Sequence, residues 1–286
     1  MRTYNFRPRS GILLVKETAQ EIEKAISEGR SEIQISLDLG LSKSLVKIEG
    51  NHAIFPDGSR IDIERIKKIE SGDVCLIEDN EVFKLAFYSQ GRYYRLLSVG
   101  PSEAPTLEVS GIHMHRIKYT TPWKDSLEKI KAVRVFDGAR VLDIGTGLGY
   151  TAIIAHRWGG DVLSIEVDEN VLRMAEANPW SRELSSPGIE IVLGDAVKVV
   201  KELPESSFHR VVHDPPRFAL AGELYSKSFY QELFRVMKPR GRIYHYVGDP
   251  GKWRRKRLVA GVIKRLKEVG FVRLKQMAAG VVAEKP

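Results

Sequence analysis

The sequence predicts an α/β protein with a doubly wound parallel sheet, preceded by a small domain that is α+β or mostly β. From about residue 139 onward, short apolar runs alternate with helical patterns, which is the order of βαβ units and a parallel sheet. Before about residue 100, most apolar residues alternate with polar ones at the period of a strand. We place the two domains at 1–110 and 111–286, with a Gly- and Pro-containing connection at 100–105.

The composition is that of a globular protein. The 286 residues are 43% hydrophobic and 29% charged. No apolar run approaches the roughly 20 residues that cross a bilayer, and the N-terminus lacks the apolar core of a secretory signal. A single cysteine, Cys75, excludes a disulfide framework and a Cys-based zinc site. We therefore expect a cytoplasmic protein with no membrane partner.

The formal net charge of +8 leaves two interpretations open. A basic protein suits a polyanion such as RNA, because cations that contact phosphates release counterions. A soluble protein with surplus lysine, of the kind that thermophiles make, has the same balance. Charge alone does not decide between them.

The first hundred residues contain one helical pattern and several strand patterns. Residues 18–28 have the apolar spacing of an amphipathic helix that Gly29 ends. The segment 40–46 resembles the turn of a helix-turn-helix, but its alternating flanks predict a hairpin instead. We leave the role of this domain open between substrate recognition and a structural or dimerising function. The predicted strands are 33–37, 45–49, 52–55, 74–77, 82–88 and 93–99, with a short helix at 61–70.

Two histidines and a helix start follow this domain. His113 and His115 would share one face of a strand, but no third ligand accompanies them, and we expect no metal. Thr121 and Pro122 are residue types favoured at the N-cap and first position of a helix. We expect that helix to run to about Phe136.

A glycine-rich turn organises the second domain. A short apolar strand ends at Asp143, glycines follow at 145, 147 and 149, and a helical pattern begins after them. Alternating glycines let the backbone turn with positive φ and approach a nucleotide-like ligand closely. The spacing differs from the dinucleotide fingerprint G-x-G-x-x-G. The acid before the first glycine would repel a pyrophosphate but favour an ammonium.

Two further acids end the next two predicted strands. Glu166 closes the strand 161–166 and lies 21 residues beyond Gly145. In such folds an acid at about 20 residues binds the ribose hydroxyls. A helix at 169–177 follows, and Asp195 ends the strand that begins at 189. An ordinary glycine turn does not explain three acids at three successive strand ends.

Together these residues resemble motif I and the acids that follow it in the class I S-adenosylmethionine (SAM)-dependent methyltransferases. The resemblance extends from about residue 119 to the end and is nearest to uncharacterised archaeal members related to the spermidine synthase branch. It implies a Rossmann-like fold, SAM as cofactor and S-adenosylhomocysteine as product. It also implies that Tyr119–Asp125 border the cofactor pocket. The cofactor-binding residues that it implies are Asp143, Gly145, Thr146, Gly147, Gly149, Tyr150, Glu166, Asp195 and Ala196.

The fourth predicted strand, 209–213, runs into the sequence Asp-Pro-Pro-Arg-Phe at 214–218. Prolines fix an extended turn there, just past the strand end. The segment resembles the Asp/Asn-Pro-Pro-aromatic motif of methyltransferases that act on amino groups of adenine or guanine. In those enzymes the acid and a proline carbonyl accept hydrogen bonds from the amine, and the aromatic ring stacks on the base.

This second resemblance implies how the acceptor is held. Asp214 and Pro215 would orient the acceptor as catalytic residues, and Arg217 and Phe218 would bind it. Here the aromatic residue comes one position later than in the motif, which weakens the expectation of stacking. His213 is our candidate proton acceptor. A similar motif in RNA 5-methylcytosine methyltransferases requires a cysteine nucleophile, and the distant Cys75 excludes that reaction.

The stretch 143–248 also resembles the aminopropyltransferases, the spermidine synthase family. Shared features are a Leu-Tyr-Ser segment at 224–226 and a Lys-Pro-x-Gly turn at 238–241. In that family an Asp-x-x-Asp-Pro motif supplies the general base as its first acid, and that position is Val211 here. His213 is near enough in the sequence to substitute, so this alternative stays open.

The C-terminal segment combines a basic run with two closing strands. Lys252–Arg257 contains five cations and one tryptophan before a predicted helix at 258–268. Such a run suits RNA phosphates and base stacking, although cations oppose the dipole at a helix N-terminus. A solvated basic face is the alternative. Strands at 271–276 and 281–283 predict an antiparallel hairpin that ends the sheet.

The sequence therefore predicts a SAM-dependent methyltransferase that methylates an amino nitrogen of a nucleobase. RNA is the favoured acceptor, bound through a basic surface that includes Lys252–Arg257. Two alternatives remain: methyl or aminopropyl transfer to a small amine or polyamine, and a SAM-binding module without catalysis. The sequence does not determine the oligomeric state.

Overall fold

The chain forms two compact units in a computed structural model that describes residues 2–216, 218, 221–248 and 252–286, without the side chains of 252–255. The N-terminal unit comprises Arg7–Asp125 and Arg173–Glu183. The C-terminal unit comprises Met1–Phe6, Ser126–Leu172 and Leu184–Pro286. The division differs from the boundary we placed after residue 110. Residues 111–125 belong with the N-terminal unit. There a strand at Thr106–Val109, which we did not predict, pairs with a strand at Ile112–His113 at the edge of a sheet.

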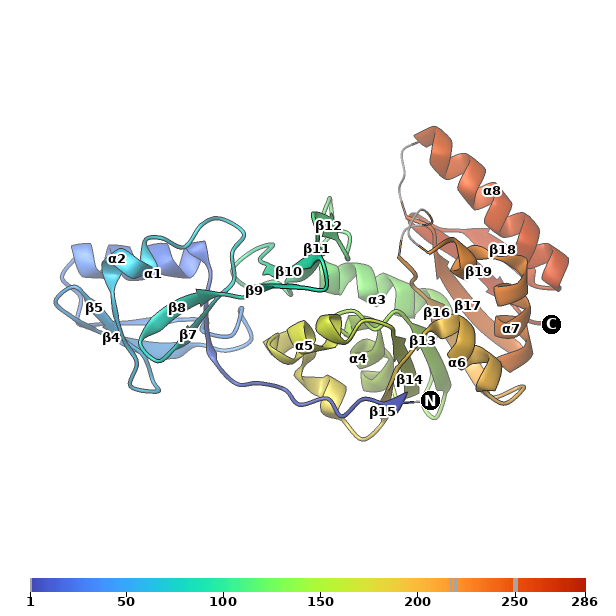
Figure 1. The fold of residues 1–286 in the computed structure, drawn as a ribbon, viewed down its shortest axis with the longest axis horizontal. Coiled ribbons are helices and arrows are strands. Elements are labelled where there is room, and N and C mark those ends of the chain that lie inside the picture. Colours follow the sequence, from blue (N-terminus) through green and yellow to red (C-terminus); the bar gives the residue numbers. More distant parts are fainter. Residues whose placement is uncertain (1, 217, 219–220, 249–251) are drawn as a thin grey trace. The chain divides into compact units, whose positions relative to one another are not determined.

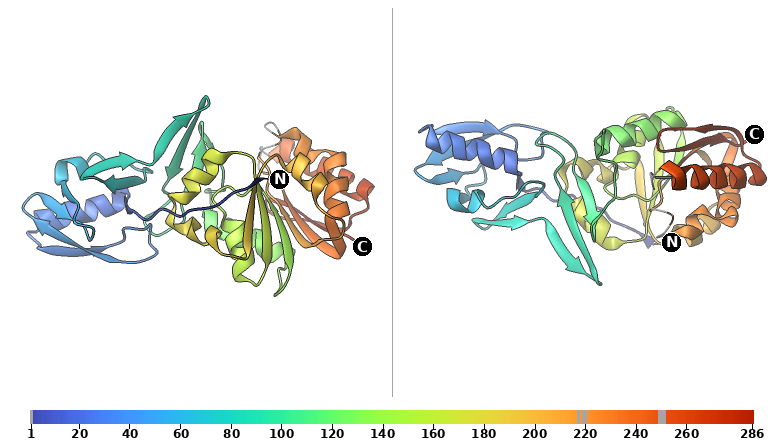
Figure 2. Two further views of the ribbon diagram at one scale, coloured as in Figure 1. Left: turned by 60° about the horizontal axis from the view of Figure 1, so that its bottom comes forward. Right: turned by 90° about the horizontal axis from the view of Figure 1, so that it is seen from above.

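The N-terminal unit contains three small antiparallel sheets and two helices among its described residues. The sheet orders are β3-β4-β5-β6, β2-β7-β8 and β12-β11-β10-β9. Figure 2 shows α1 against the strands of this unit. The bounds are β2 Ile12–Leu14, α1 Lys16–Ser27, β3 Glu32–Ile35, β4 Ser44–Glu49, β5 His52–Ile54, β6 Arg60–Asp62, α2 Ile63–Ile66, β7 Cys75–Glu78, β8 Glu81–Lys84, β9 Ala86–Ser89, β10 Arg92–Leu97, β11 Thr106–Val109 and β12 Ile112–His113.

The alternating pattern of the first hundred residues has a simple cause. Residues such as Ile35, Val46 and Ile61 point into one core that α1 also covers with Ile22, while the polar residues between them face solvent. The strands β3 and β4 pair antiparallel across the turn at 36–43. The hairpin that we preferred over a helix-turn-helix is therefore confirmed.

One sheet of eight described strands organises the C-terminal unit (Figure 1). Its order is β1-β15-β14-β13-β16-β17-β19-β18. The five central strands from β15 to β17 run parallel, whereas β19 and β18 run antiparallel at one edge. This is the doubly wound sheet with a terminal hairpin that the sequence predicts. The short β1 on the other edge pairs antiparallel with β15, and we did not predict it.

The elements of this unit alternate as βαβ units require. Their bounds are β1 Arg2–Thr3, α3 Pro122–Val133 (which begins in the N-terminal unit), β13 Arg140–Ile144, α4 Tyr150–Arg157, β14 Asp161–Glu166, α5 Glu169–Glu176, η1 Pro179–Ser185, β15 Ile189–Leu193, α6 Ala196–Glu202, β16 Phe208–His213, η2 Gly222–Tyr225, α7 Lys227–Val236, β17 Met237–Tyr246, α8 Lys252–Val269, β18 Val272–Gln276 and β19 Gly280–Glu284. The strand β17 begins at Met237, which pairs with Phe208 of β16, so the Lys-Pro-x-Gly segment at 238–241 lies within this strand.

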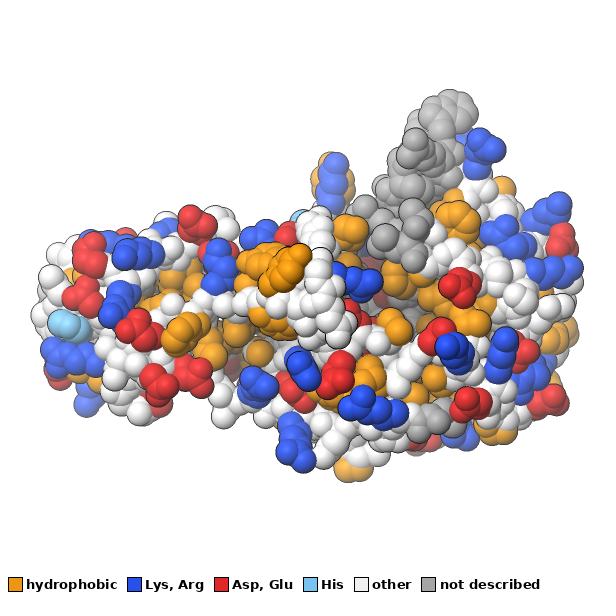
Figure 3. Space-filling model, viewed as in Figure 1, with side chains coloured by type: hydrophobic (Ala, Val, Ile, Leu, Met, Phe, Trp, Pro, Cys, Tyr) orange, Lys and Arg blue, Asp and Glu red, His pale blue; other side chains and the backbone are white. Residues whose placement is uncertain are grey.

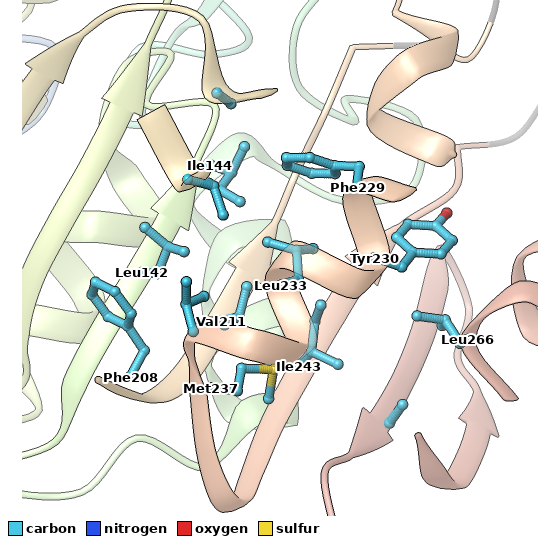
Figure 4. Close-up of a cluster of buried hydrophobic side chains, with 14 of the residues drawn as sticks. Leu142, Ile144, Phe208, Val211, Phe229, Tyr230, Leu233, Met237, Ile243 and Leu266 are labelled. Atoms are coloured by element: carbon cyan, nitrogen blue, oxygen red, sulfur yellow. The ribbon is translucent and has the colours of Figure 1, made fainter. Parts of the chain in front are cut away.

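A hydrophobic core lies between this sheet and the helices α6, α7 and α8 (Figure 4). Leu142, Val211 and Ile243 come from three adjacent strands and are fully buried. Leu233 of α7 and Leu266 of α8 meet them from the helices. Because parallel strands are covered on both faces, their carboxyl ends are the edge at which loops are exposed to build a site.

Within the described part of the chain, no helix combines the length and apolar character needed to cross a membrane.

Candidate active site

The glycine turn connects β13 to α4 with left-handed backbone at all three glycines. The φ angles are +92° at Gly145, +56° at Gly147 and +80° at Gly149. A Cβ at Gly145 would lie 2.6 Å from the backbone oxygen of Asp214, so that position must be glycine for two strand ends to approach. A Cβ at Gly147 would point into open space. The turn thus leaves room beside its middle glycine, as close approach of a ligand to the backbone requires.

Asp143 lies in β13 directly before this turn, and its carboxylate is connected to the turn through hydrogen-bonded hydroxyl groups. Its side chain is buried and accepts hydrogen bonds from Thr151 Oγ1 (2.9 Å) and Ser164 Oγ (2.7 Å). Thr146 Oγ1 continues the network, 2.7 Å from Ser164 Oγ. Burial raises the pKa of Asp143 to about 7 against the lowering by these hydroxyls. The Asp143 carboxylate is therefore buried and bonded to hydroxyl groups of the protein. A direct contact between this carboxylate and an ammonium group of the cofactor stays a prediction.

Glu166 lies at the end of β14 and is tied to the same turn. Its Oε2 accepts from the backbone N–H of Gly147 (2.9 Å), and its Oε1 accepts from those of Val167 (2.9 Å) and Asp168 (3.1 Å). Burial raises the pKa of Glu166, and these hydrogen bonds oppose the rise. The acid expected to bind ribose is thus positioned directly against the middle of the glycine turn.

The remaining predicted cofactor residues lie at neighbouring helix starts. Asp195 caps α6 by accepting from the N–H of Val197 (2.9 Å), and its side chain is partly exposed. Ala196 and Tyr150 begin α6 and α4 and are buried. Because β13, β14 and β15 are adjacent in the sheet, the three acids follow one another along the same edge. Their binding roles remain predictions, but the topology brings them together.

Asp214 follows β16 and adjoins the turn from the other side. Its N–H donates to Ile144 O at the end of β13 (3.0 Å). Its carboxylate, 18% exposed, lies 2.6 Å from the ammonium of Lys129 on α3. The following Pro215 is buried, and the carbonyl of Pro216 accepts from Tyr225 Oη (3.0 Å). Hydrogen bonds on both sides thus hold the segment, and the backbone of Asp214 lies next to the glycine turn.

Lys129 is the site residue that the sequence reasoning missed. Its side chain is 3% exposed and also lies over the ring of Tyr246, 4.8 Å from the centroid. No motif contains it, because it lies 85 residues before Asp214 on a helix expected only to pack. A lysine on the buried face of an amphipathic helix is the one signal that could have indicated it.

His213, our candidate proton acceptor, is the last residue of β16. The ring is completely buried, and its Nε2 donates to Leu224 O (2.9 Å). Burial lowers the pKa of His213 to about 4, with a small opposing effect from that hydrogen bond. Its ring packs 4.4 Å from that of His245. At neutral pH this histidine is therefore uncharged, because desolvation disfavours its protonated form, and its role as the proton acceptor stays a prediction.

The predicted substrate residues are described only in part. Phe218 is 48% exposed and packs edge-on against Tyr225, with ring centroids 5.3 Å apart. Arg217 lies outside the described residues. The basic run at 252–257 forms the first turns of α8, and of its side chains Lys256 and Arg257 are described and exposed. The contribution of these residues to substrate binding remains a prediction.

Residues singled out near the start of α3 belong to the N-terminal unit. Asp125 pairs with Arg116 (2.8 Å), Trp123 packs on Trp180, and Tyr119 is 95% exposed. The contact of Tyr119–Asp125 with a cofactor stays a prediction.

The two histidines have polar partners of their own. His113 Nε2 lies 3.1 Å from Glu108 Oε2, and His115 Nδ1 lies 3.1 Å from Thr106 Oγ1. Among the described residues, no three His, Cys, Asp or Glu side chains are grouped as a metal site would need.

The residues at this sheet edge fit SAM. The open space at Gly147 leaves room for a ligand against the backbone, and Glu166 and Asp195 supply hydrogen-bond acceptors of the kind that ribose and adenine require. Asp214 adds a further acid at the end of β16, the strand that pairs with β13 on the side away from β14.

Comparison with known proteins agrees with this geometry. Residues 136–268 match a methyltransferase domain. The uncharacterized protein MJ1233 of Methanocaldococcus jannaschii is 47% identical over 286 residues, 96% of this chain and 97% of that protein. Polyamine aminopropyltransferase 2 of Streptomyces coelicolor is 29% identical over 38% of this chain and 22% of its own length. A putative ribosomal RNA large subunit methyltransferase of M. jannaschii is 33% identical over 29% of this chain and 22% of its own length.

A solved structure shows the same fold. Spermidine synthase from Thermotoga maritima aligns with a TM-score of 0.54 at 19% identity, over 70% of this chain and 71% of that one. The chain belongs to the class I SAM-dependent methyltransferases. Within that class it is a member of the family of the M. jannaschii protein. The predicted fold class, the prediction of a methyltransferase and SAM as its cofactor are thereby confirmed.

Proposed function

We propose that this protein methylates an amino nitrogen of a nucleobase, and that its acceptor is RNA. The observation that carries the proposal is the position of Asp214. A Cβ added to Gly145 would lie 2.6 Å from the backbone oxygen of Asp214, so Asp214 directly adjoins the glycine turn. An acceptor that hydrogen-bonds Asp214 would therefore lie next to the cofactor.

The chemistry requires little more than alignment of the acceptor. When bound, SAM supplies an electrophilic methyl group on its sulfonium. An exocyclic amino nitrogen of a base is a poor nucleophile, because its lone pair is delocalised into the ring. A carboxylate that accepts one N–H of this group fixes its direction and stabilises the positive charge that develops on nitrogen. The bond from the methyl group to sulfur would break as the bond to nitrogen forms, which leaves S-adenosylhomocysteine, and the carboxylate would take the N–H proton that the methylated nitrogen must lose. Asp214 is held for this by Lys129 and by the hydrogen bond of its N–H to Ile144.

The exposed aromatic residue in the same segment supports a planar acceptor. Phe218 lies four residues after Asp214, is 48% exposed, and is kept in place edge-on by Tyr225. An exposed ring held beside an amine-binding acid offers a surface on which a base can stack.

The charge distribution supports RNA as the molecule that carries the base. The N-terminal unit contains 19 Lys and Arg against 20 Asp and Glu, whereas the C-terminal unit contains 26 against 17. The excess positive charge is thus confined to the unit that contains Asp214. Figure 3 shows Lys and Arg side chains over the described part of α8. Lys256, Arg257, Lys264 and Lys267 are exposed there.

A second candidate, aminopropyl transfer to a polyamine, is suggested by the relatives and the fold. Its chemistry needs a base that deprotonates the attacking amine. The position of that base in the aminopropyltransferase motif is occupied by Val211, whose side chain is completely buried in the core under the sheet. The nearby His213 is buried with a lowered pKa. We therefore favour methyl transfer.

The test is transfer of a labelled methyl group from SAM to unmodified ribosomal and transfer RNA transcripts, with spermidine and putrescine as competing acceptors. We expect label in RNA, recovered after nuclease digestion as an N-methylated base. Asp214→Asn should reduce the rate about tenfold or more, the value of one hydrogen bond to a charged group. Glu223→Gln, which alters an exposed acid nearby, is the matched control. Label in a polyamine, or transfer from decarboxylated SAM, would show the second candidate to be right.

A further inference from the structure

Lys129 is a buried cation in the acceptor region for which the family resemblance gives no role. Its Nζ lies 2.6 Å from Asp214 Oδ2 and 4.8 Å from the ring centroid of Tyr246. The lysine side chain is 3% exposed and that of Asp214 is 18% exposed. The Lys129 ammonium is thus the more deeply buried member of the pair, and the Asp214 carboxylate is the member that keeps some contact with solvent.

Burial of an ammonium group is costly unless a close partner compensates it. The partners of Lys129 among the described residues include the Asp214 carboxylate and the Tyr246 ring face, both in this unit. Asp143 is also close. Burial and the two hydroxyl partners have the largest effects on the pKa of Asp143. Beyond these, Asp214 raises the pKa of Asp143 and Lys129 lowers it. Burial raises the pKa of Tyr225, and Asp214 contributes to the rise. Among the described residues, the groups near Asp214 thus include the Lys129 ammonium, the buried Asp143 and Tyr225.

We propose that Lys129 determines the charge of the acceptor: its pairing with Asp214 selects a neutral nitrogen and rejects an ammonium. The inference deepens the proposed function, because it rests on Asp214 facing the acceptor. An unpaired carboxylate at this position would attract any protonated amine. With Lys129 beside it, the carboxylate still accepts a hydrogen bond from a neutral N–H, but a second cation is repelled.

This selection has chemical value. A protonated amine has no lone pair and cannot attack a methyl group, yet it binds a bare carboxylate more strongly than a neutral amino group does. Polyamines would then be persistent competitive inhibitors of transfer to a base. The fixed ammonium of Lys129 beside Asp214 weakens the binding of polyamines but leaves a carboxylate oxygen to accept a hydrogen bond from a neutral amino group. The site thus gains specificity by repelling the wrong ligand.

The test measures spermidine binding by calorimetry to protein saturated with S-adenosylhomocysteine. Wild type and Lys129→Arg, which keeps the charge, should bind spermidine weakly. Lys129→Met should bind it about tenfold more tightly or better, as removal of one close repulsion predicts. The double variant Lys129→Met/Asp214→Asn should lose that gain. Lys129→Gln provides a second neutral variant, and thermal unfolding verifies that each variant is folded.

Equal spermidine affinity in wild type and both neutral variants would overturn the proposal. A gain that persists in the double variant would also overturn it, because the gain would then not come from Asp214. The result is independent of RNA methylation. If wild type methylates no RNA but the spermidine differences appear, the acceptor is a different neutral amine and the role of Lys129 stands. If RNA is methylated and the differences do not appear, only the role of Lys129 fails.

Discussion

Gly145 and Gly147 lie two residues apart in one turn but have different surroundings. Both have left-handed backbone, which disfavours any residue with a Cβ. At Gly145 the added carbon would also collide with the backbone of Asp214, whereas at Gly147 it would meet nothing within 4 Å. One glycine therefore serves the packing of two strand ends, and the other keeps space for a ligand.

Alanine substitutions should separate these two roles. We expect Gly145→Ala to lower the free energy of unfolding by about 2–4 kcal/mol, because a backbone clash adds to the left-handed strain. Gly147→Ala should cost only about 1 kcal/mol in stability but weaken SAM binding markedly. Chemical unfolding and calorimetry with SAM measure the two effects. Equal stability of the two variants would contradict the packing role of Gly145.

Asp143 makes stability depend on pH in a direction unusual for an acid. Its pKa is about 7 in the folded protein against an ordinary value of 3.8. Between pH 3.8 and about pH 7, Asp143 is therefore protonated in the folded state but ionised in the unfolded state. This contribution to stability is complete below about pH 4 and is lost as the pH rises through about 7.

The variant Asp143→Asn should remove this dependence. The stability of wild type relative to the variant should fall between pH 4 and pH 7 by at most about 4 kcal/mol, since one pKa unit corresponds to about 1.4 kcal/mol. The loss of a hydrogen-bond acceptor gives a constant offset, so the slope is the quantity to measure. Urea unfolding at several pH values provides it. Parallel profiles would show that Asp143 ionises normally.

At the scale of elements, buried histidines join the strands β16 and β17 to the segments that pack over them. His213 on β16 donates to Leu224 O in η2, and His245 on β17 lies 2.8 Å from Tyr230 Oη on α7. The Tyr225 hydroxyl extends the same cluster to the Pro216 carbonyl. The position of the Asp-Pro-Pro segment therefore depends on histidines that stay uncharged.

Acid should loosen this cluster. Burial lowers the pKa of His213 to about 4 and that of His245 well below its ordinary value, so the unfolded state binds more protons below about pH 6.5. The contribution of these two histidines to stability should therefore fall as the pH drops from about 6.5 toward 4. The variant His213→Gln should show a decline smaller by about 3 kcal/mol over this window. Unfolding curves at pH 7, 6, 5 and 4.5 test this, and an unchanged decline would contradict it.

At the scale of the whole molecule, the charge is divided unequally between the two units. The near-neutral N-terminal unit has no general electrostatic attraction for a polyanion, whereas the C-terminal unit does. Exposed cations on α8 lie on the same unit as the glycine turn and Asp214. If RNA is the acceptor, the catalytic unit itself should supply most of the salt-dependent affinity.

Neutralising two of these cations should reduce the salt dependence of RNA binding. For Lys256→Gln/Arg257→Gln we expect the slope of log K against log salt to fall by about 1.5, because each phosphate contact contributes about 0.7–0.9. Lys43→Gln/Lys47→Gln, which removes two exposed cations of the N-terminal unit, is the matched control. Fluorescence anisotropy over a salt series measures both. Equal slopes in the two variants would place the RNA elsewhere.

The sequence by itself determined the order of the elements around the site. Glycines at alternate positions, acids at successive strand ends and the Asp-Pro-Pro segment are local signals, because each is recognised from residues that are neighbours in the chain. These signals sufficed to predict the doubly wound sheet, its terminal hairpin and SAM as the cofactor. They did not predict β1, which is too short to have a period and exists because the edge of β15 is available for pairing.

Only the tertiary structure decided the surroundings of each acid and base of the site. Asp143 and His213 have the residue types of chemical groups, but both are buried, and desolvation disfavours their charged forms. Lys129 and Asp214 lie 85 residues apart, and only the packing of α3 against the sheet brings them within 2.6 Å. Charge pairing over such a separation leaves no local pattern in the chain, since it depends on three-dimensional distance alone.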